Sequence, residues 1–231
     1  MSEHEAIAET FDAWCEAGRG DKMEVGHGDV VEQVVEQLDI RPGEKILDLG
    51  CGTGWATRML AQRAAGVQAI GVDVSPGMVA RAEALHSFTI RARYEVCPFE
   101  ALDFGDATFD RVFSMEALYY AVDLEQVLAE LLRVLKPGGA VDVVIDYYKD
   151  SPHTESWHTH VPVDMLWLSA AEWTRRFEAA GFEDLSTRRV VDRRGPGDEA
   201  TFQPSQWCES WEAQSSIHAE GSLWIHARKP A

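Results

Sequence analysis

A glycine-rich run is the part of this 231-residue chain whose residue types are best suited to chemistry. It reads DLGCGTG, so Gly50, Gly52 and Gly54 stand at every second position after Asp48. Glycine adopts positive φ without strain and leaves space where a Cβ would collide with a ligand. A helical pattern begins at Trp55, and the first N–H groups of a helix have no partner inside it. The run therefore predicts a site where a small ligand lies against the backbone.

Such a turn alone does not separate the classes of nucleotide-binding protein, because nicotinamide and flavin proteins use similar turns. Two acids narrow the choice. Asp48 precedes the glycines inside the predicted strand, which gives D-x-G-x-G-x-G rather than G-x-G-x-x-G. Asp73 closes the next predicted strand, where its carboxylate can accept hydrogen bonds from both hydroxyls of a ribose. A Lys-Pro-Gly-Gly turn at 136–139 precedes a later strand.

With these features together, the chain closely resembles the class I S-adenosylmethionine-dependent methyltransferases, particularly the small-molecule branch typified by ubiquinone and menaquinone biosynthesis. The resemblance is strong over residues 40–150 and looser elsewhere. It implies S-adenosylmethionine as the cofactor and a small molecule as the methyl acceptor. The positions that match the family's cofactor-binding motifs are Asp48, Gly50, Cys51, Gly52, Thr53, Gly54, Asp73, Val74, Met78, Pro98, Phe99, Glu100 and Met115.

One of these motifs departs from its usual form. The family pattern G-D-A-E-x-L-P-F corresponds here to CPFEALDF at 97–104, so Pro98 replaces the Asp that binds the adenine amine. The resemblance then implies that the adenine is held by the backbone at Phe99 and by apolar packing, with Val74 and Met78 flanking the ring.

Residues that could act on the acceptor are harder to assign. Methyl transfer from a sulfonium is an in-line displacement, so the enzyme chiefly positions the acceptor and excludes water. A general base is needed only if the nucleophile arrives protonated. The family's motif at 109–120 implies that Glu116 and Tyr119 lie near the reacting end of the cofactor. Relatives commonly bind substrate just after the fifth strand, which adds His153 and His158 as catalytic candidates.

The N-terminal segment 11–27 is a second source of acceptor contacts, because in this family the first helices often fold over the cofactor as a lid. The candidates for lid and acceptor contacts are Arg19, Met23, Glu24, His27, Tyr120, Tyr147 and Trp157. The alternatives are surface charges in the lid and a solvated loop with aromatic anchors at 147–167. Glu155, His158 and His160 have metal-binding side chains, but we expect no metal site.

The apolar pattern predicts the elements that must position these residues. Short strands are expected at 45–49, 67–72, 90–96, 109–114, 140–145, 185–192 and 222–228. Helices are expected at 4–16, 28–39, 55–65, 76–85, about 124–135, 169–180 and 204–218, with a glycine-containing break at 18–28 and an irregular stretch at 147–167.

Continuous apolar strands separated by helices indicate a parallel sheet with both faces covered. The resemblance sharpens this α/β prediction to a Rossmann-like, seven-stranded, mostly parallel sheet of order 3-2-1-4-5-7-6 with its last strand antiparallel. We expect a single domain over 1–231. It comprises an N-terminal helical lid at 1–40, a cofactor-binding core at 41–150, and substrate-side elements with a final hairpin at 151–231.

Composition bounds the partners. The 39 acidic and 21 basic residues give a net charge of −18, which repels phosphate backbones and argues against a nucleic acid partner. The four cysteines form no CxxC pair, so we expect reduced thiols rather than zinc or disulfides. The N-terminus is acidic, unlike a signal peptide, and no long apolar run exists, so a cytoplasmic location without membrane contact is expected. Whether the chain forms a homodimer is open.

The excess of carboxylates over lysines adds an expectation about the environment. Only Lys22, Lys45, Lys136, Lys149 and Lys229 are lysines. Many acids with few lysines resemble proteins of salt-loving organisms, so we expect a halophilic protein that is more stable in molar salt.

Three rival functions remain. An RNA or protein methyltransferase is disfavoured by the absence of a basic patch, and Ser114-Met115-Glu116-Ala117 replaces the N/D-P-P-Y/F motif of nucleobase amino-group methylation. A non-catalytic cofactor-binding regulator conflicts with the intact run from Asp48 to Gly54. A nicotinamide dehydrogenase conflicts with the position of Asp48 ahead of the glycines.

Overall fold

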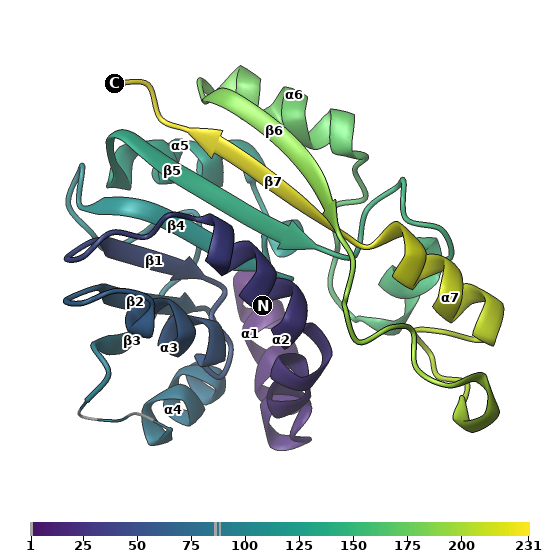
Figure 1. Cartoon of the computed structure of the whole chain (residues 1–231). Helices are drawn as coiled ribbons and strands as arrows, with labels where there is room; N and C mark the ends of the chain where they lie inside the picture. Colours follow the sequence, from purple (N-terminus) through teal and green to yellow (C-terminus); the bar gives the residue numbers. More distant parts are fainter. Residues whose placement is uncertain (1, 86, 88) are drawn as a thin grey trace.

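Seven strands form one sheet in the computed structural model, which describes residues 2–85, 87 and 89–231 (Figure 1). The strands are β1 (Lys45–Leu49), β2 (Gln68–Asp73), β3 (Ala92–Val96), β4 (Phe109–Met115), β5 (Leu135–Ile145), β6 (Glu183–Val190) and β7 (Ser222–Arg228). Their order is β3-β2-β1-β4-β5-β7-β6, and β7 runs antiparallel to both of its neighbours. The expected fold and strand order are confirmed.

Helices cover both faces of the sheet. They are α1 (Glu3–Glu16), α2 (Arg19–Gln37), α3 (Trp55–Gln62), α4 (Pro76–Ala84), α5 (Leu124–Val134), α6 (Ala170–Ala180) and α7 (Trp211–Glu220). Alternate strand residues point to opposite faces, so Leu47 packs on the side of α5 and α6 while Ile46 packs on the side of α2, α3 and α4. None of the helices in the described ranges is long and apolar enough to cross a membrane.

The N-terminal segment differs from the expectation of a glycine-containing break at 18–28. The chain turns only at Gly18, whose φ is 68°, and α2 then runs without interruption from Arg19. Glycine is a poor helix former, but tertiary contacts override that preference here. Gly20 is buried against the glycine-rich loop, where an added Cβ would lie 2.6 Å from Cγ2 of Thr53. The segment predicted as a break is therefore part of helix α2.

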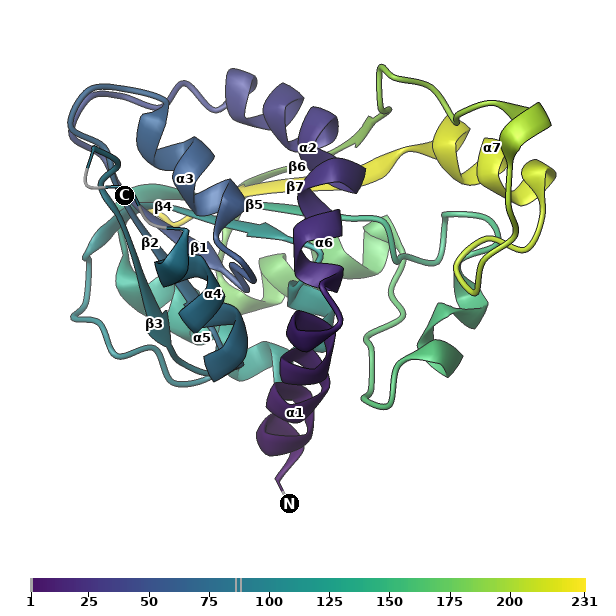
Figure 2. The ribbon, with the colours of Figure 1, turned by 90° about the horizontal axis from the view of Figure 1, so that it is seen from below.

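Helix α1 and the first turns of α2 lie beyond the carboxyl ends of the parallel strands, where the lid is expected. Figure 2 shows the later turns of α2 continuing beside α3, and their buried valines pack on one face of the sheet. Two side chains of α1 fasten it to the core. Asp12 accepts a hydrogen bond from the Gly77 N–H at 2.8 Å, and Nε2 of His4 lies 2.7 Å from Oε2 of Glu100.

Two further elements differ from the expected boundaries. The Lys-Pro-Gly-Gly segment is not a turn before the fifth strand but the irregular start of β5, with a register shift between Phe109 and Arg111 on the paired strand. The helix expected at 204–218 is shorter, because α7 begins only at Trp211, where the Ser210 side chain accepts a hydrogen bond from the Ala213 N–H.

A charged network lies in the middle of the sheet. Asp142 on β5 is fully buried and accepts a hydrogen bond from Arg111 on β4 at 2.8 Å. Its other oxygen accepts a hydrogen bond from Nε1 of Trp224 at 2.9 Å and lies 2.8 Å from Nδ1 of His226. Arg111 also donates to the Leu38 carbonyl at the end of α2. This network joins three neighbouring strands to the lid helix.

Replacing Arg111 by Leu should lower the free energy of unfolding by about 3–5 kcal/mol, because Asp142 would remain buried without its charged partner. Urea unfolding followed by circular dichroism measures this difference. Arg176→Leu is the matched control, since its ion pair with Glu125 is exposed and should contribute less than about 1 kcal/mol. Equal losses in the two variants would contradict a structural role for the buried network.

Candidate functional site

A cavity of about 690 Å³ opens between the lid and the carboxyl ends of the strands. Its walls combine the glycine-rich loop, the ends of β2, β4 and β5, and side chains of α1 and α2. Of the residues predicted from sequence, those that line it are Arg19, Met23, His27, Asp48, Gly50, Cys51, Gly52, Thr53, Asp73, Val74, Met78, Pro98, Phe99, Glu100, Met115, Glu116, Tyr119, Tyr120 and Trp157.

The glycines of the loop have different roles. Gly50 and Gly54 have φ near 75°, and an added Cβ would lie 2.2 Å from Cβ of Ala117 or 2.4 Å from the ring of Tyr94. These two positions exclude any side chain, and Gly54 itself lies behind the cavity wall. Gly52 also has positive φ, but no heavy atom lies within 4 Å of its Cβ position. Space for a ligand is therefore left above Gly52.

Asp73 connects the loop to the end of β2. One of its carboxylate oxygens accepts a hydrogen bond from the Gly52 N–H and the other from the Ser75 N–H, each at 2.9 Å. Each oxygen keeps a further lone pair for a ligand. Burial raises the pKa of Asp73 to about 6.

Asp48 is a second buried carboxyl beneath the same loop. It accepts a hydrogen bond from the Thr57 hydroxyl, and burial, together with the charge of Asp73, raises its pKa to about 7. Among the residues that the structure describes, neither carboxylate has a cationic partner. A bound cation such as an ammonium group would stabilise both in their charged form.

The adenine end predicted from sequence forms a mainly apolar wall. Val74, Met78, Pro98 and Phe99 line it. Within the described residues, no free carboxylate stands in for the Asp that the family motif has at the position of Pro98. Glu100 lines the same region, but its Oε1 accepts a hydrogen bond from the Val122 N–H at 2.8 Å, and its Oε2 contacts His4. Its carboxylate therefore connects the core to the lid.

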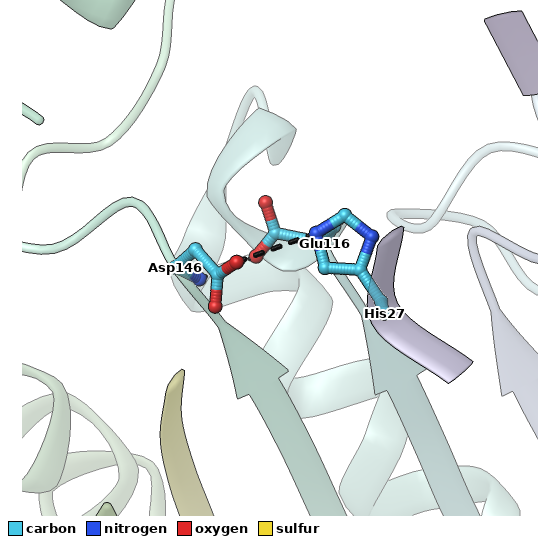
Figure 3. Close-up of side chains that lie close together, drawn as sticks. All are labelled: His27, Glu116 and Asp146. Atoms are coloured by element: carbon cyan, nitrogen blue, oxygen red, sulfur yellow. Dashed lines mark hydrogen bonds and ion pairs between the residues drawn. The ribbon is translucent and has the colours of Figure 1, made fainter. Parts of the chain in front are cut away.

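Three titratable side chains meet at the other end of the cavity (Figure 3). His27 comes from α2, Glu116 follows β4, and Asp146 follows β5. Nε2 of His27 lies 3.3 Å from Oδ2 of Asp146. Glu116 accepts hydrogen bonds from the Asp146 N–H and, at 2.8 Å, from the Tyr119 hydroxyl. Nδ1 of His27 lies 3.1 Å from the Met23 carbonyl, so it carries a proton and Nε2 faces the carboxylates.

The charges in this cluster follow from its geometry. Burial alone would lower the pKa of His27, but the hydrogen bond and charge of Asp146 raise it to about 9. Burial works against ionisation of Asp146 as well, yet His27 holds its pKa below the usual value. Burial and the charge of Asp146 raise the pKa of Glu116 to about 7. His27 and Asp146 therefore form an ion pair, while Glu116 exchanges its proton near neutral pH.

Aromatic side chains form the remaining wall. Phe11 of α1 packs edge-on against Trp14 and Tyr120 with ring centroids 5.1 and 5.0 Å away. Trp157 lies 5.9 Å from Trp207 and donates its Nε1 hydrogen to the Trp207 carbonyl at 2.7 Å. The lid and two distant segments of the chain thus enclose one apolar compartment.

Several predicted residues lie elsewhere. His153 and His158 are exposed outside the cavity lining, and Nδ1 of His158 contacts the Glu155 carbonyl at 2.7 Å. Tyr147 is fully buried behind the cavity wall, 5.5 Å from the ring of Tyr119. Glu24 is exposed on the lid.

The structure also adds lining residues that the sequence analysis did not assign to the site. Asp146, Trp207 and Gln214 are the clearest examples. Asp146 follows the fifth parallel strand, where ligands bind in such sheets, so strand position was an available signal for it. Trp207 and Gln214 lie in the 195–220 region, and no motif marked them.

Comparisons with known proteins place the chain among methyltransferases. The family model described as "Methyltransferase domain" matches residues 46–139. The O-methyltransferase resE of Aspergillus sclerotiorum is 31% identical, over 79% of this chain and 71% of its own length. The 2-methyl-6-phytyl-1,4-hydroquinone methyltransferase of Synechocystis sp. is 35% identical over 62% of this chain and 51% of its own length. This chain spans about half the length of that protein and of the two malonyl-[acyl-carrier protein] O-methyltransferases that it also matches.

Among solved structures, a putative methyltransferase crystallised with the Haloferax volcanii Trm112 methyltransferase activator superposes with a TM-score of 0.88. It is 32% identical, and the match covers 96% of this chain and 98% of that one. The chain therefore belongs to the S-adenosylmethionine-dependent methyltransferases, and its cofactor is S-adenosylmethionine.

Proposed function

We propose that this protein transfers a methyl group from S-adenosylmethionine to a small-molecule acceptor. The main support for the proposal is that one cavity contains both the proposed donor-binding residues and a group of titratable side chains that could act on the acceptor. The glycine-rich loop and Asp73 line one end, and the His27, Glu116 and Asp146 cluster lines the other. Names of relatives such as O-methyltransferase resE support the same reading.

The end of the cavity beside the glycine-rich loop has residues suited to binding S-adenosylmethionine. Gly52 leaves open space above the backbone, and the free lone pairs of Asp73 suit two ribose hydroxyls. Asp48 and Asp73, buried without a cation, favour a positively charged ligand. When bound, S-adenosylmethionine supplies an electrophilic methyl group on a sulfonium. The protein's own residues then have to orient the acceptor and exclude water.

The lid is suited to excluding water. Gly20 of α2 packs directly on Thr53 of the glycine-rich loop, and Phe11 of α1 packs on Tyr120. His27 connects α2 to the end of β5 through Asp146. Closing these contacts seals the cavity from two sides, which strengthens electrostatic interactions inside it.

Glu116 is positioned to accept a proton from the acceptor. Its carboxylate lines the cavity and is held by the Asp146 N–H and the Tyr119 hydroxyl. His27 cannot act as this base near pH 7, because Asp146 keeps it protonated. Glu116 would accept the proton that a hydroxyl acceptor loses when it takes the methyl group and the donor leaves as a neutral thioether.

Replacing Asp73 by Ala should weaken binding of S-adenosylhomocysteine by about 1–3 kcal/mol, because charge-assisted hydrogen bonds to the ribose are lost. Calorimetric titration measures the affinity. Asp106→Ala is the control, since Asp106 forms an exposed ion pair with Arg133 and does not line the cavity. Unchanged affinity in Asp73→Ala would rule out the ribose assignment, and binding of NADH in place of S-adenosylhomocysteine would rule out the methyltransferase.

Incubation with methyl-labelled S-adenosylmethionine and an extract of the source organism should label the small-molecule fraction. Glu116→Gln should reduce labelling by about 100-fold or more, because proton transfer to the base is lost. Labelling by the unaltered protein should increase as pH rises through about 7, where Glu116 becomes ionised. Label in macromolecules would refute the small-molecule proposal, and full activity in Glu116→Gln would exclude it as the base.

We also propose that the chain binds a protein partner of the Trm112 type. The support is the match to the Haloferax volcanii complex over nearly the whole length of both chains. Co-expression with Haloferax volcanii Trm112 should give a complex that elutes together in size-exclusion chromatography in molar salt. Separate elution of the two chains, each folded, would contradict this partner, and a homodimer would elute at twice the monomer mass.

The acidic composition supports a further proposal, that the protein is adapted to high salt. The formal net charge of −18 is spread along the sequence, and carboxylates occur in every part of the chain. Salt screens their mutual repulsion in the folded state.

A further inference from the structure

Arg19 has an unusual position for a basic residue of this protein. It is the first residue of α2, lines the cavity and is only partly exposed. Its guanidinium carbon lies 3.9 Å from the ring centroid of Trp14 and 5.4 Å from that of Trp207. Both tryptophans also line the cavity. The guanidinium therefore lies within the apolar compartment formed by Phe11, Trp14, Tyr120, Trp157 and Trp207, called the aromatic compartment below.

No carboxylate neutralises this guanidinium within the described residues. Arg19 forms no hydrogen bond and no ion pair there, although the chain has 39 acidic residues. Lys22 also lines the cavity without a described ion pair, but it is exposed, whereas Arg19 lies against two indole rings. Burial lowers the pKa of Arg19, and no carboxylate opposes that effect.

An unpaired arginine beside a cavity has a specific chemical use. The guanidinium presents planar N–H donors that match a carboxylate or phosphate, and stacking on an indole fixes its plane. Here Trp14 and Trp207 cover the guanidinium with aromatic rings but leave its hydrogen-bonding capacity unused. The site is therefore suited to a ligand that has an anionic group attached to an apolar or planar ring or chain.

We infer that Arg19 binds an anionic group, a carboxylate or phosphate, of a ligand held in the cavity. This inference rests on the proposed function. It specifies the methyl acceptor as a small organic acid whose remaining part is apolar. Its neighbours favour the acceptor, because Trp14, Trp207 and Tyr120 belong to the aromatic compartment. The carboxylate of the cofactor's amino acid portion is the other source of the same chemistry, and binding measurements distinguish the two.

The test uses the full chain and four ligands. The first pair is 2-naphthoate and its neutral analogue 2-naphthamide, titrated in the presence of S-adenosylhomocysteine. The second pair is S-adenosylhomocysteine and 5′-methylthioadenosine, which lacks the amino acid carboxylate. Calorimetry gives the affinities, and the indole N–H signals of Trp14 and Trp207 in NMR spectra locate the naphthyl ligands.

Arg19→Met keeps an unbranched apolar side chain against Trp14 but removes the charge. Arg188→Met is the matched control, because Arg188 also lies over an indole, 5.2 Å from Trp224, but outside the cavity. Melting curves of both variants confirm that they fold. Arg19→Lys, which keeps the charge but loses the planar fork, should retain part of the affinity.

If the acceptor supplies the anion, the unaltered protein and Arg188→Met bind naphthoate about 10-fold or more tightly than naphthamide, and Arg19→Met loses this preference. If the cofactor supplies the anion, Arg19→Met weakens binding of S-adenosylhomocysteine by a similar factor but leaves the affinity for methylthioadenosine unchanged. Equal affinities of Arg19→Met and the unaltered protein for all four ligands overturn the inference. Failure of the proposed function is distinct, since the unaltered protein would then bind neither adenosine compound.

Discussion

The close approach of the glycine-rich loop to the end of β4 is the constraint on which the site depends. Gly50 leaves so little space that Cβ of Ala117 occupies the place of any side chain, and Gly54 does the same against Tyr94. Because the loop cannot move outward without losing these contacts, it holds Asp48 beneath it and Asp73 beside it. Glu116, the residue before Ala117, is fixed by the same contact. The residues proposed to bind the donor and the acceptor therefore lie on one support.

The lid is attached to this support at the positions that would contact ligands. Gly20 lies on Thr53 of the loop, and His27 pairs with Asp146 at the end of β5. The second half of α2 is fixed to the sheet by the buried side chains of Val31, Val34 and Val35, whereas the first turns of α2 are attached by the close contact of Gly20 and the ion pair of His27.

The sequence predicts the sheet well because its strands and helices depend on local signals. Continuous apolar runs and helical periodicity place the strands and helices, while the roles of Asp48 and Asp73 toward the cofactor stay predictions. The lid between 18 and 28 does not follow, since its helix is stabilised by contacts of Gly20 with residues far along the chain. His153 and His158 have suitable side chains for catalysis, but the backbone places them outside the cavity.

Charge separates the two ends of the cavity. Asp48 and Asp73 are buried acids beside the glycine-rich loop, and under the proposed function a sulfonium or ammonium group there would favour their charged forms. At the acceptor end, His27 is neutralised by Asp146, so Arg19 is the cation left without a described partner in the aromatic compartment. A chain with a net charge of −18 would repel an organic acid over most of its surface. A single unpaired guanidinium inside the cavity gives such an acid one favourable position, and the surrounding rings restrict its orientation.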